Sequence, residues 1–227
     1  MKIAIFAATV PELASLQKKM PQGMASKANH LIQYCITGIG MLQSTFNIQQ
    51  HIYRHRPDFL LQIGIAGCFS QEVPLGTVIA VHREYLGSLG VNEGHWLDIF
   101  DLGLQDGSQP PFLKKALINS QIEEWDWLHK AGIITGDAIT VDEITTNESR
   151  IEDLKRAYGT AESPGHFPML ESMEGASLHF TGLQYELPYL QIRGVSNYIG
   201  QRDKSKWQIP AALQGVTAAA LKVIANI

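Results

Sequence analysis

Short apolar runs alternate with segments of helical pattern along the chain, and this alternation constrains the fold more than any other feature. The apolar runs cover residues 2–8, 31–37, 59–65, 77–82, 132–135 and 189–195. Near-continuous apolar runs suit strands that are covered on both faces. Helical patterns cover residues 10–19, 41–55, 148–157, 173–184 and 210–224. Strands that alternate with helices in this way predict a layered α/β fold.

Length and charge limit the number of domains and the class of partner. The chain has 227 residues, of which 45% are apolar, and a formal net charge of −4. This length suits one core, so residues 1–227 are predicted to form a single domain. The charge favours neither a nucleic-acid partner nor a membrane partner. The sequence contains no apolar run of about 18 residues, the length that predicts a membrane-spanning helix.

The N-terminal segment and the two cysteines both bear on the compartment in which the protein acts. The apolar N-terminus is read as the first strand rather than a secretion signal, because turn residues follow it directly. Cys35 and Cys68 both lie in apolar runs, so buried thiols are expected rather than a disulfide. A cytoplasmic protein is therefore expected.

His51 and His55 are the residues that most resemble part of a metal site. They are four residues apart on a predicted helix, but no third ligand lies near them in the sequence. The alternative is a solvated helix face. We predict neither a metal nor an organic cofactor.

Two segments read as long loops. Residues 87–111 are rich in Gly and Asp and carry His95, Trp96 and Phe100, and residues 159–168 have a similar composition. Loops of this length are usually functional or poorly ordered.

Two glycine turns follow predicted strands, at residues 37–40 (TGIG) and 64–67 (GIAG). Glycine lets backbone N–H groups approach a ligand closely, and open α/β sheets bind small molecules at the carboxyl ends of their strands. We therefore expect Gly64, Ile65 and Ala66 to contact a ligand. A dinucleotide-binding fingerprint is not present, because the first turn lacks the required third glycine. This argues against an oxidoreductase with a nucleotide cofactor.

Three polar side chains stand at the ends of predicted elements. Glu12 lies in the first turn of a helix, Glu174 lies at the start of another, and Asn197 follows a strand. Each has an ordinary structural explanation, either the helix dipole or turn chemistry. Their joint occurrence with the glycine turns is more informative.

Taken together, these motifs resemble the nucleoside phosphorylase and nucleosidase superfamily over nearly the whole chain. The matching segments are Glu12 after the first strand, TGIG at 37–40, GIAG at 64–67, TGDA at 135–138, SMEGA at 172–176 and IRGVSN at 192–197. The resemblance implies a three-layer fold with a mixed central sheet flanked by helices, and a homodimer or higher homo-oligomer. Within the superfamily, residues 171–175 (ESMEG) and 193–198 (RGVSNY) are most similar to the futalosine hydrolase branch. That branch implies a step of menaquinone biosynthesis.

The resemblance also implies catalytic roles for two residues. Glu12 would hold and activate an attacking water molecule. Asn197 would face the N7 edge of a purine and stabilise the negative charge that develops on the departing base.

A second group would bind the substrate. The resemblance implies that Met173 packs on the sugar, with Ser172 beside it, and that Glu174 accepts hydrogen bonds from ribose hydroxyls. The backbone near Ile139 and Thr140 would border the base.

Two departures from the superfamily bear on the reaction. Phosphorylases carry an arginine and a serine around the second glycine turn, where this chain has Gln62, Ile63, Gly64 and Ile65. A phosphate dianion needs charge-assisted donors, so water is the expected nucleophile. Adenine-specific nucleosidases have an aspartate at the position of Asn197. An amide NH2 group suits the N7 and O6 acceptors of hypoxanthine, so a 6-oxopurine nucleoside, best futalosine, is the expected substrate.

Several alternatives stay open. Within the superfamily they are an adenine-releasing methylthioadenosine/S-adenosylhomocysteine nucleosidase and a purine nucleoside phosphorylase. From another class, a nucleoside-binding protein without catalysis is possible, although a binder has no need of Glu12. The aromatic loop around His95, Trp96 and Phe100 is a candidate wall for the 5′ substituent, in this chain or from a neighbouring subunit. Arg202 is read either as a partner for a substrate carboxylate or as a surface ion pair with Asp203.

Overall fold

The computed structural model describes residues 1–23, 30–159 and 169–227. Its elements, in chain order, are β1 (Lys2–Ala7), α1 (Val10–Lys19), β2 (Leu31–Ile36), α2 (Met41–His55), β3 (Phe59–Cys68), β4 (Val78–Leu86), β5 (Gly90–Asn92), β6 (Trp96–Asp98), β7 (Phe112–Leu113), β8 (Ala116–Ile118), η1 (Ser120–Glu124), α3 (Trp127–Lys130), β9 (Ile134–Thr140), α4 (Glu148–Tyr158), β10 (Met169–Ser172), α5 (Gly175–Gln184), β11 (Tyr189–Tyr198), η2 (Lys204–Lys206) and α6 (Ile209–Asn226).

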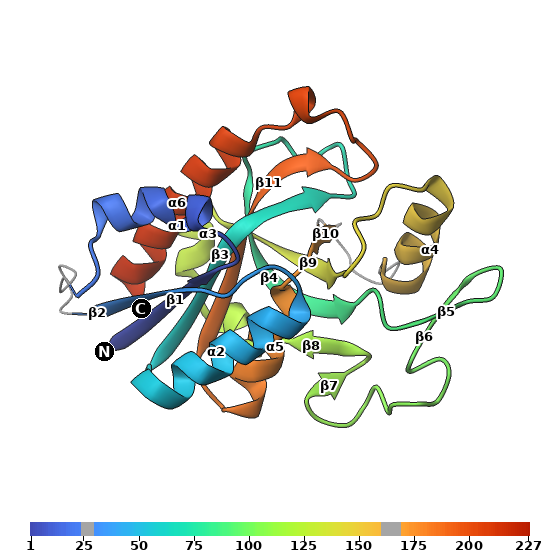
Figure 1. The fold of residues 1–227 in the computed structure, drawn as a ribbon, viewed down its shortest axis with the longest axis horizontal. Coiled ribbons are helices and arrows are strands. Elements are labelled where there is room, and N and C mark those ends of the chain that lie inside the picture. The colour runs from blue at the N-terminus through green and yellow to red at the C-terminus, as the bar shows by residue number, and fades with distance from the viewer. Residues whose placement is uncertain (24–29, 160–168) are drawn as a thin grey trace.

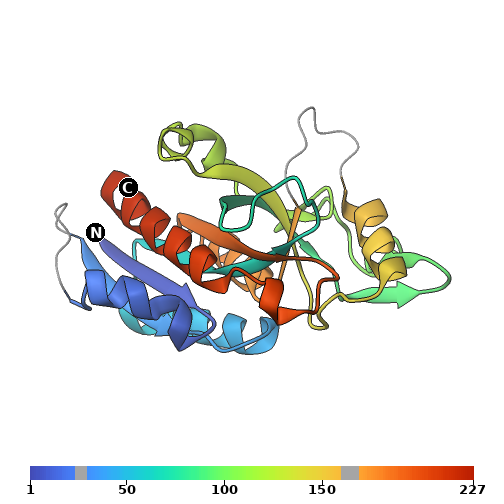
Figure 2. The ribbon, with the colours of Figure 1, turned by 90° about the horizontal axis from the view of Figure 1, so that it is seen from above.

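Helices cover the main sheet on two sides. The α1 and α6 helices lie on one side, and α2 and α5 lie on the other (Figure 1). The sheet is mixed, with parallel pairs such as β1–β3 and β3–β11 and antiparallel pairs such as β10–β3 and β11–β4. The prediction of a mixed sheet between helical layers is therefore confirmed. Seen from above, the two termini lie near each other at one end, and α4 lies toward the opposite end (Figure 2).

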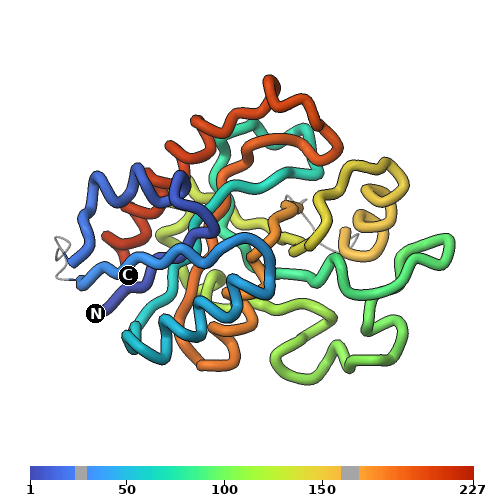
Figure 3. The backbone as a smooth tube through the Cα atoms, in the orientation of Figure 1, coloured from blue at the N-terminus to red at the C-terminus, as the bar shows by residue number. Residues whose placement is uncertain are grey.

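Five strands close into a ring. The pairs β3–β10, β10–β9, β9–β4, β4–β11 and β11–β3 form a complete circuit. An apolar cluster within this set draws side chains from all five strands: Ala66, Cys68, Ile79, Val81, Ala138, Leu170 and Val195. The ring holds the carboxyl ends of β3 and β11 side by side, and the path of the chain around it can be followed in Figure 3.

Most predicted elements match the structure, and the differences have local causes. The predictions for α1 and α2 agree with the structure to the residue. The strand predicted over 132–135 instead runs over Ile134–Thr140 and includes Asp137, which is buried beside Arg83. The helix predicted from Met173 begins at Gly175. The short β10 strand was missed because it holds Glu171 and Ser172.

Of the two predicted loops, one is partly ordered as strands. Residues 87–111 contain the β5–β6 hairpin, followed by turns in which the Asp98 carboxylate accepts hydrogen bonds from the N–H groups of Phe100 and Asp101. Of the other segment, 159–168, residues 160–168 lie outside the described part of the chain.

The α6 helix qualifies the prediction that no helix is long and apolar enough to cross a membrane. Among the described residues, α6 alone meets that test of length and composition. Its buried side chains include Ala212, Val216 and Ala220, and the helix packs on β11 and α1. The apolar composition therefore serves the core that α6 shares with the sheet.

Both thiols are free, Cys68 being buried and Cys35 half-buried. His51 is not the solvated residue that the helix-face interpretation expected. It packs edge-on against Phe6 and lies 3.3 Å from the Gln33 side-chain oxygen. Burial and the nearby His55 lower the pKa of His51 to about 4. In the described part of the chain, no group of three or more His, Cys, Asp or Glu side chains is arranged to hold a metal ion.

The core predicts a matched pair of stability effects. Leu61 lies in β3 and is fully buried, whereas Leu104 is 74% exposed. Replacing Leu61 by Ala is expected to lower the free energy of unfolding by about 2–5 kcal/mol, because it removes buried methyl groups and leaves a cavity. Leu104→Ala is expected to change it by less than about 0.5 kcal/mol. Urea titration followed by circular dichroism measures both, and equal effects would contradict the assigned core.

Candidate active site

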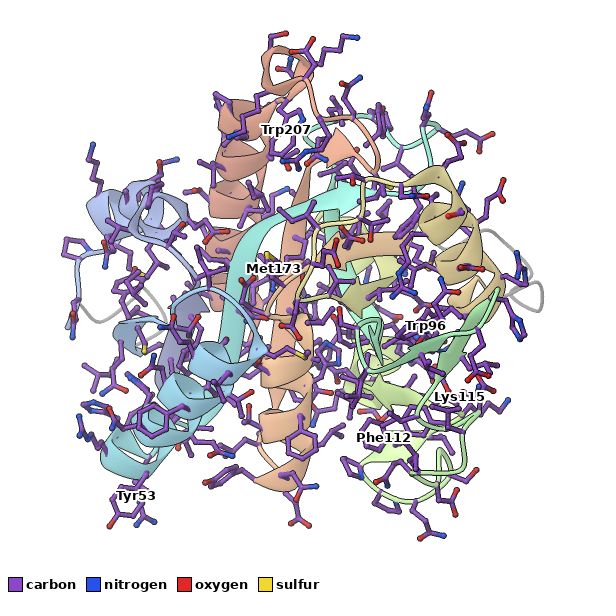
Figure 4. The ribbon with its side chains drawn as sticks, turned by 45° about the vertical axis from the view of Figure 1, so that its right-hand side comes forward. Tyr53, Trp96, Phe112, Lys115, Met173 and Trp207 are labelled. Atoms are coloured by element: carbon purple, nitrogen blue, oxygen red, sulfur yellow. The ribbon has the colours of Figure 1, made fainter. Side chains whose placement is uncertain are left out.

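A cavity of about 320 Å³ opens at the carboxyl ends of β3 and β11. Its lining brings together most of the predicted site residues: Glu12, Ile65, Ala66, Ser172, Met173, Glu174 and Asn197. In Figure 4, Met173 lies over the β3 ribbon, with Trp207 above it in the same view. Segments more than 150 residues apart in the sequence therefore meet at one cavity.

Glu12 occupies a break in the pairing along one edge of β3. On that edge, β1 pairs with residues 59–62 and β10 pairs with residues 67–68. Between these two partners, the N–H of Ile65 donates to Oε1 of Glu12 over 3.1 Å. The N–H and the hydroxyl of Thr9 donate to Oε2 over 3.0 and 2.9 Å. Three donors thus fix the carboxylate where the sheet lacks a strand.

Gly64 makes room for this arrangement but does not itself line the cavity. A Cβ atom on Gly64 would collide with the Arg193 guanidinium and would lie 2.8 Å from Oε1 of Glu12. Arg193 is fully buried and donates to the side-chain oxygen of Gln62 over 3.0 Å. The buried guanidinium and the Glu12 carboxylate therefore both lie close to Gly64.

Glu174 is held against the first glycine turn. Its Oε1 accepts a hydrogen bond from the N–H of Gly40 over 3.0 Å. Gly38 and Gly40 have φ values of +80° and +86°, which glycine adopts without strain. Burial raises the pKa of Glu174, as does the negative charge of Glu12, while Arg193 and the Gly40 N–H oppose the shift. Glu174 and Glu12 are therefore two acidic groups of the same cavity.

Asn197 lies across β3 from the Glu12 edge, where β11 bulges and Asn197 comes into register with Gly67. The Ser196 hydroxyl donates to Oδ1 of Asn197 over 2.8 Å. Nδ2 donates one N–H to the carbonyl of Tyr198 over 3.1 Å. An amide nitrogen carries two N–H groups, so one remains to meet a ligand.

Ile139 and Thr140 are the last two residues of β9. Both side chains are fully buried and neither residue lines the cavity. The Thr140 hydroxyl donates to Glu84 over 2.7 Å and accepts the N–H of Ala176. Both residues lie within β9, so the lining of this cavity does not support the prediction that the backbone near them borders the base.

The cavity lining also includes residues that sequence reasoning missed. Ile144 and Thr145 line it from the loop after β9, and Trp207 lines it just before α6. Glu171 lines it from β10 and is 6% exposed. The sequence singled out Glu171 only as part of the ESMEG motif. Its role in the cavity was missed because the sequence did not predict the buried strand β10 in which it lies.

The aromatic loop lies beside the cavity rather than in it. Trp96 lines a separate hollow that shares Ile144 and Thr145 with the main cavity. The guanidinium of Arg150 lies 3.9 Å from the centre of the Trp96 ring, and Phe100 packs against Phe112. Within this chain the loop therefore does not form the predicted wall.

Arg202 lines the main cavity near its mouth. Its guanidinium lies 5.7 Å from the centre of the Trp207 ring. Asp203 accepts hydrogen bonds from the N–H and hydroxyl of Ser205 instead. In the described residues no ion pair joins Arg202 to Asp203, which argues against the surface-pair interpretation.

A family model for the phosphorylase superfamily matches residues 3–227. The chain belongs to this superfamily. The match confirms the resemblance drawn from the motifs.

Relatives within the superfamily are of two kinds. The futalosine hydrolase of Streptomyces coelicolor is 27% identical over 167 residues, which span 73% of this chain and 65% of that protein. The futalosine hydrolase of Thermus thermophilus is 26% identical over 196 residues, spanning 85% and 81%. The 5'-methylthioadenosine/S-adenosylhomocysteine nucleosidase of Maridesulfovibrio salexigens is 23% identical over 231 residues, spanning 90% and 89%.

Solved structures share the fold. A mutant futalosine hydrolase of Helicobacter pylori superposes with a TM-score of 0.81 at 15% identity, and the match covers 100% of both chains. The S-adenosylhomocysteine nucleosidase of Streptococcus pyogenes, solved with 5-methylthiotubericidin, gives a TM-score of 0.79 at 17% identity, covering 100% of this chain and 97% of that one.

The contact between Gly64, Glu12 and Arg193 predicts a sensitive position. Gly64→Ala is expected to lower kcat by on the order of 100-fold. The added methyl group overlaps Oε1 of Glu12 and shifts the carboxylate away from the position in which it holds the attacking water. Binding of the free base at Asn197 should stay close to wild type. Steady-state kinetics and calorimetry measure the two quantities. A folded variant with unchanged kcat would show that the position of Glu12 does not matter.

Proposed function

We propose that this enzyme, a nucleosidase that cleaves N-glycosidic bonds, hydrolyses futalosine, a 6-oxopurine nucleoside, and releases hypoxanthine. The observation that carries the proposal is the meeting of Glu12 and Asn197 at one cavity across the end of β3. In this proposal residues 1–227 form one nucleosidase domain, act in the cytoplasm and supply a step of menaquinone biosynthesis by the futalosine route.

The spacing of the two groups along β3 suits a nucleoside. Glu12 is bound at Ile65, and Asn197 is in register with Gly67. Two residues of a strand span about 7 Å along β3, and the two groups also lie on opposite edges of that strand, so a sugar and a purine fit between them. In this arrangement Glu12 orients and deprotonates water at one face of the anomeric carbon, as a general base. Asn197 stabilises the negative charge on the base as the bond breaks.

The ribose is held between these groups. Glu174 accepts hydrogen bonds from ribose hydroxyls through the carboxylate oxygens that Gly40 leaves available, and Met173 packs on the sugar. Ser172 lines the same wall. Holding the sugar in a reactive orientation is worth several kcal/mol in favourable systems, on the order of a thousandfold in rate.

The base is assigned from the amide at position 197. The free N–H of Asn197 suits an edge that carries the N7 and O6 acceptors, whereas adenine presents an amino group in place of O6. With adenine, the N–H of Asn197 would face the amino group of the base, and two donors cannot pair. A buried polar group would stay unpaired, which disfavours the adenine nucleosides.

Water rather than phosphate is the nucleophile in this proposal. Gln62 is fully buried, and both ends of its amide are engaged, by Arg193 and by the carbonyl of Glu174. Among the described residues that line the cavity, Arg202 is the only cation, and it lies near the mouth. A phosphate dianion beside the sugar would have no charged donor of its own.

The 5′ substituent of futalosine, an aromatic ketone with a carboxylate, is assigned to the mouth of the cavity. Trp207, Ile209 and Leu213 supply an apolar wall there, and Arg202 supplies a positive charge. In this assignment the aromatic ketone packs on the apolar wall, and Arg202 pairs with the carboxylate of the substituent.

A homodimer forms through α2 in this proposal. The exposed face of α2 carries three large apolar side chains: Leu42, which is 87% exposed, Phe46, which is 61% exposed, and Tyr53, which is 74% exposed. Contiguous exposed apolar side chains mark protein–protein contacts. Ile39, just before α2, is exposed and also lines the cavity, so a second copy on this face would border the site.

The substrate is tested by incubating the protein with futalosine, inosine or methylthioadenosine in buffer freed of phosphate, and measuring free base by chromatography. We expect hypoxanthine from futalosine and at most trace adenine from methylthioadenosine. Adenine release without activity on futalosine would overturn the substrate, and a strict need for phosphate would overturn hydrolysis.

Catalysis by Glu12 is tested with Glu12→Gln beside Glu152→Gln, which removes an exposed carboxylate on α4. Loss of the general base is expected to lower kcat by about 100- to 10,000-fold. Hypoxanthine should still bind, and Glu152→Gln should behave as wild type. Full turnover by Glu12→Gln would leave only a binding role for the cavity.

The dimer is tested with Phe46→Glu and with Leu104→Glu as the matched control. Sedimentation at micromolar concentration should give a dimer for wild type and for Leu104→Glu, and a monomer for Phe46→Glu, because a buried charge at the interface has no partner. A monomeric wild-type protein would refute the proposed assembly.

A further inference from the structure

Glu171 and Asn197 flank the same glycine of β3. Glu171 is in register with Gly67 through the β10–β3 pair, and Asn197 is in register with Gly67 through the β11–β3 pair. Residues in register across neighbouring strands project from the same face of a sheet. Two polar side chains therefore stand on either side of a residue that has none.

The gap above Gly67 has the size of a base. Neighbouring strands lie about 4.8 Å apart, so the Cα atoms of Glu171 and Asn197 are about 10 Å apart across Gly67. A Cβ atom on Gly67 would collide with Ile199 and would lie 3.3 Å from the amide nitrogen of Asn197. Glycine thus lets Ile199 form an apolar floor between the two polar groups, and all four residues line the cavity.

The Glu171 carboxylate is fixed by one oxygen and unpaired at the other. Oε1 accepts the N–H of Thr145 over 3.0 Å. Oε2 is buried and has no hydrogen-bond partner among the described residues. A buried carboxylate oxygen without a partner costs free energy, which a ligand donor would recover. Burial raises the pKa of Glu171, and hydrogen bonds from Thr145 and the positive charge of Arg150 offset part of this shift.

The discrimination that Asn197 supplies between purines depends on its one free N–H reaching O6 rather than N7 alone. One of its N–H groups is engaged by Tyr198, and N7, which the other can reach, is an acceptor in adenine and hypoxanthine alike. The two bases differ most at N1, which carries a hydrogen in hypoxanthine and a lone pair in adenine. A carboxylate accepts hydrogen bonds only, so it matches N1–H and opposes the N1 lone pair.

We propose that Glu171 is a specificity-determining residue whose Oε2 accepts the N1–H of the 6-oxopurine, while Asn197 donates to N7 on the other side of O6. The proposal rests on the nucleosidase function proposed above and adds the group that reads N1. It assigns the base to the slot over Gly67 and Ile199 and the sugar to the side of Glu12 and Glu174.

A purely structural role for Glu171 makes different predictions. As a clamp on the loop after β9, the side chain needs only one acceptor for the N–H of Thr145, which a glutamine supplies as well. As a reader of N1–H it needs two acceptors. Glu171→Gln has the same shape but only one, so its amide nitrogen would then face N1.

The test compares Glu171→Gln with Glu143→Gln, which removes an exposed carboxylate from the same loop two residues before Thr145. Calorimetry gives the Kd of each protein for hypoxanthine, 1-methylhypoxanthine and adenine, and thermal unfolding reports the stability of each variant. We expect Glu171→Gln to weaken hypoxanthine binding by about 10- to 100-fold, the range for a lost hydrogen bond to a charged group. Its preference for hypoxanthine over 1-methylhypoxanthine and over adenine should fall with it, while Glu143→Gln keeps both preferences.

The outcomes separate this inference from the function on which it rests. If wild type releases hypoxanthine from futalosine and Glu171→Gln, folded as wild type, keeps both base preferences, the role of Glu171 is refuted and the function stands. Discrimination against 1-methylhypoxanthine that persists in the isosteric variant would be steric and would also refute it. If wild type binds adenine more tightly than hypoxanthine, the proposed function itself fails.

Discussion

One hydrogen bond organises the site: the N–H of Ile65 donates to the carboxylate of Glu12. It exists because the partner of β3 changes from β1 to β10 along one edge, leaving a short stretch of backbone between them. The bond is partly buried, and an N–H that loses water without gaining an acceptor costs up to about 1–3 kcal/mol, so an acceptor at this point stabilises the fold. The first turn of α1 supplies it as a carboxylate, and the same group faces the cavity.

Two glycines of β3 turn this break into a binding site. Gly64 leaves space for Arg193 and Glu12, and Gly67 leaves space for Ile199 between Glu171 and Asn197. The charged and amide groups are held by strand pairing and by backbone N–H donors, so they need little rearrangement when a ligand enters. Preorganisation of this kind is the largest single contribution to rate in many enzymes. Some buried polar atoms near the cavity, such as Oε2 of Glu171, have no hydrogen-bond partner among the described residues, which destabilises the protein when no ligand is bound.

The sequence predicted the parts of the fold that obey simple patterns. Apolar runs gave the long strands, and the helical pattern over residues 10–19 gave the bounds of α1. The ring of five strands was beyond reach, because β10 has four residues, half of them polar, and closes the circuit through pairings that no local pattern reveals. In the site, Glu12 and Asn197 were identified through motifs. The lining residues Ile144 and Thr145 were not identified, because a motif gives a position along a strand but not which residues of the following loop return to the cavity.

The most direct test of the central claim is a crystal structure of the protein with hypoxanthine bound. The account predicts the base over Gly67, with its N7 within hydrogen-bonding distance of Nδ2 of Asn197 and its N9 directed toward the side of the cavity that holds Glu12. A base bound in the hollow beside Trp96, or one whose N9 points away from Glu12, would contradict it.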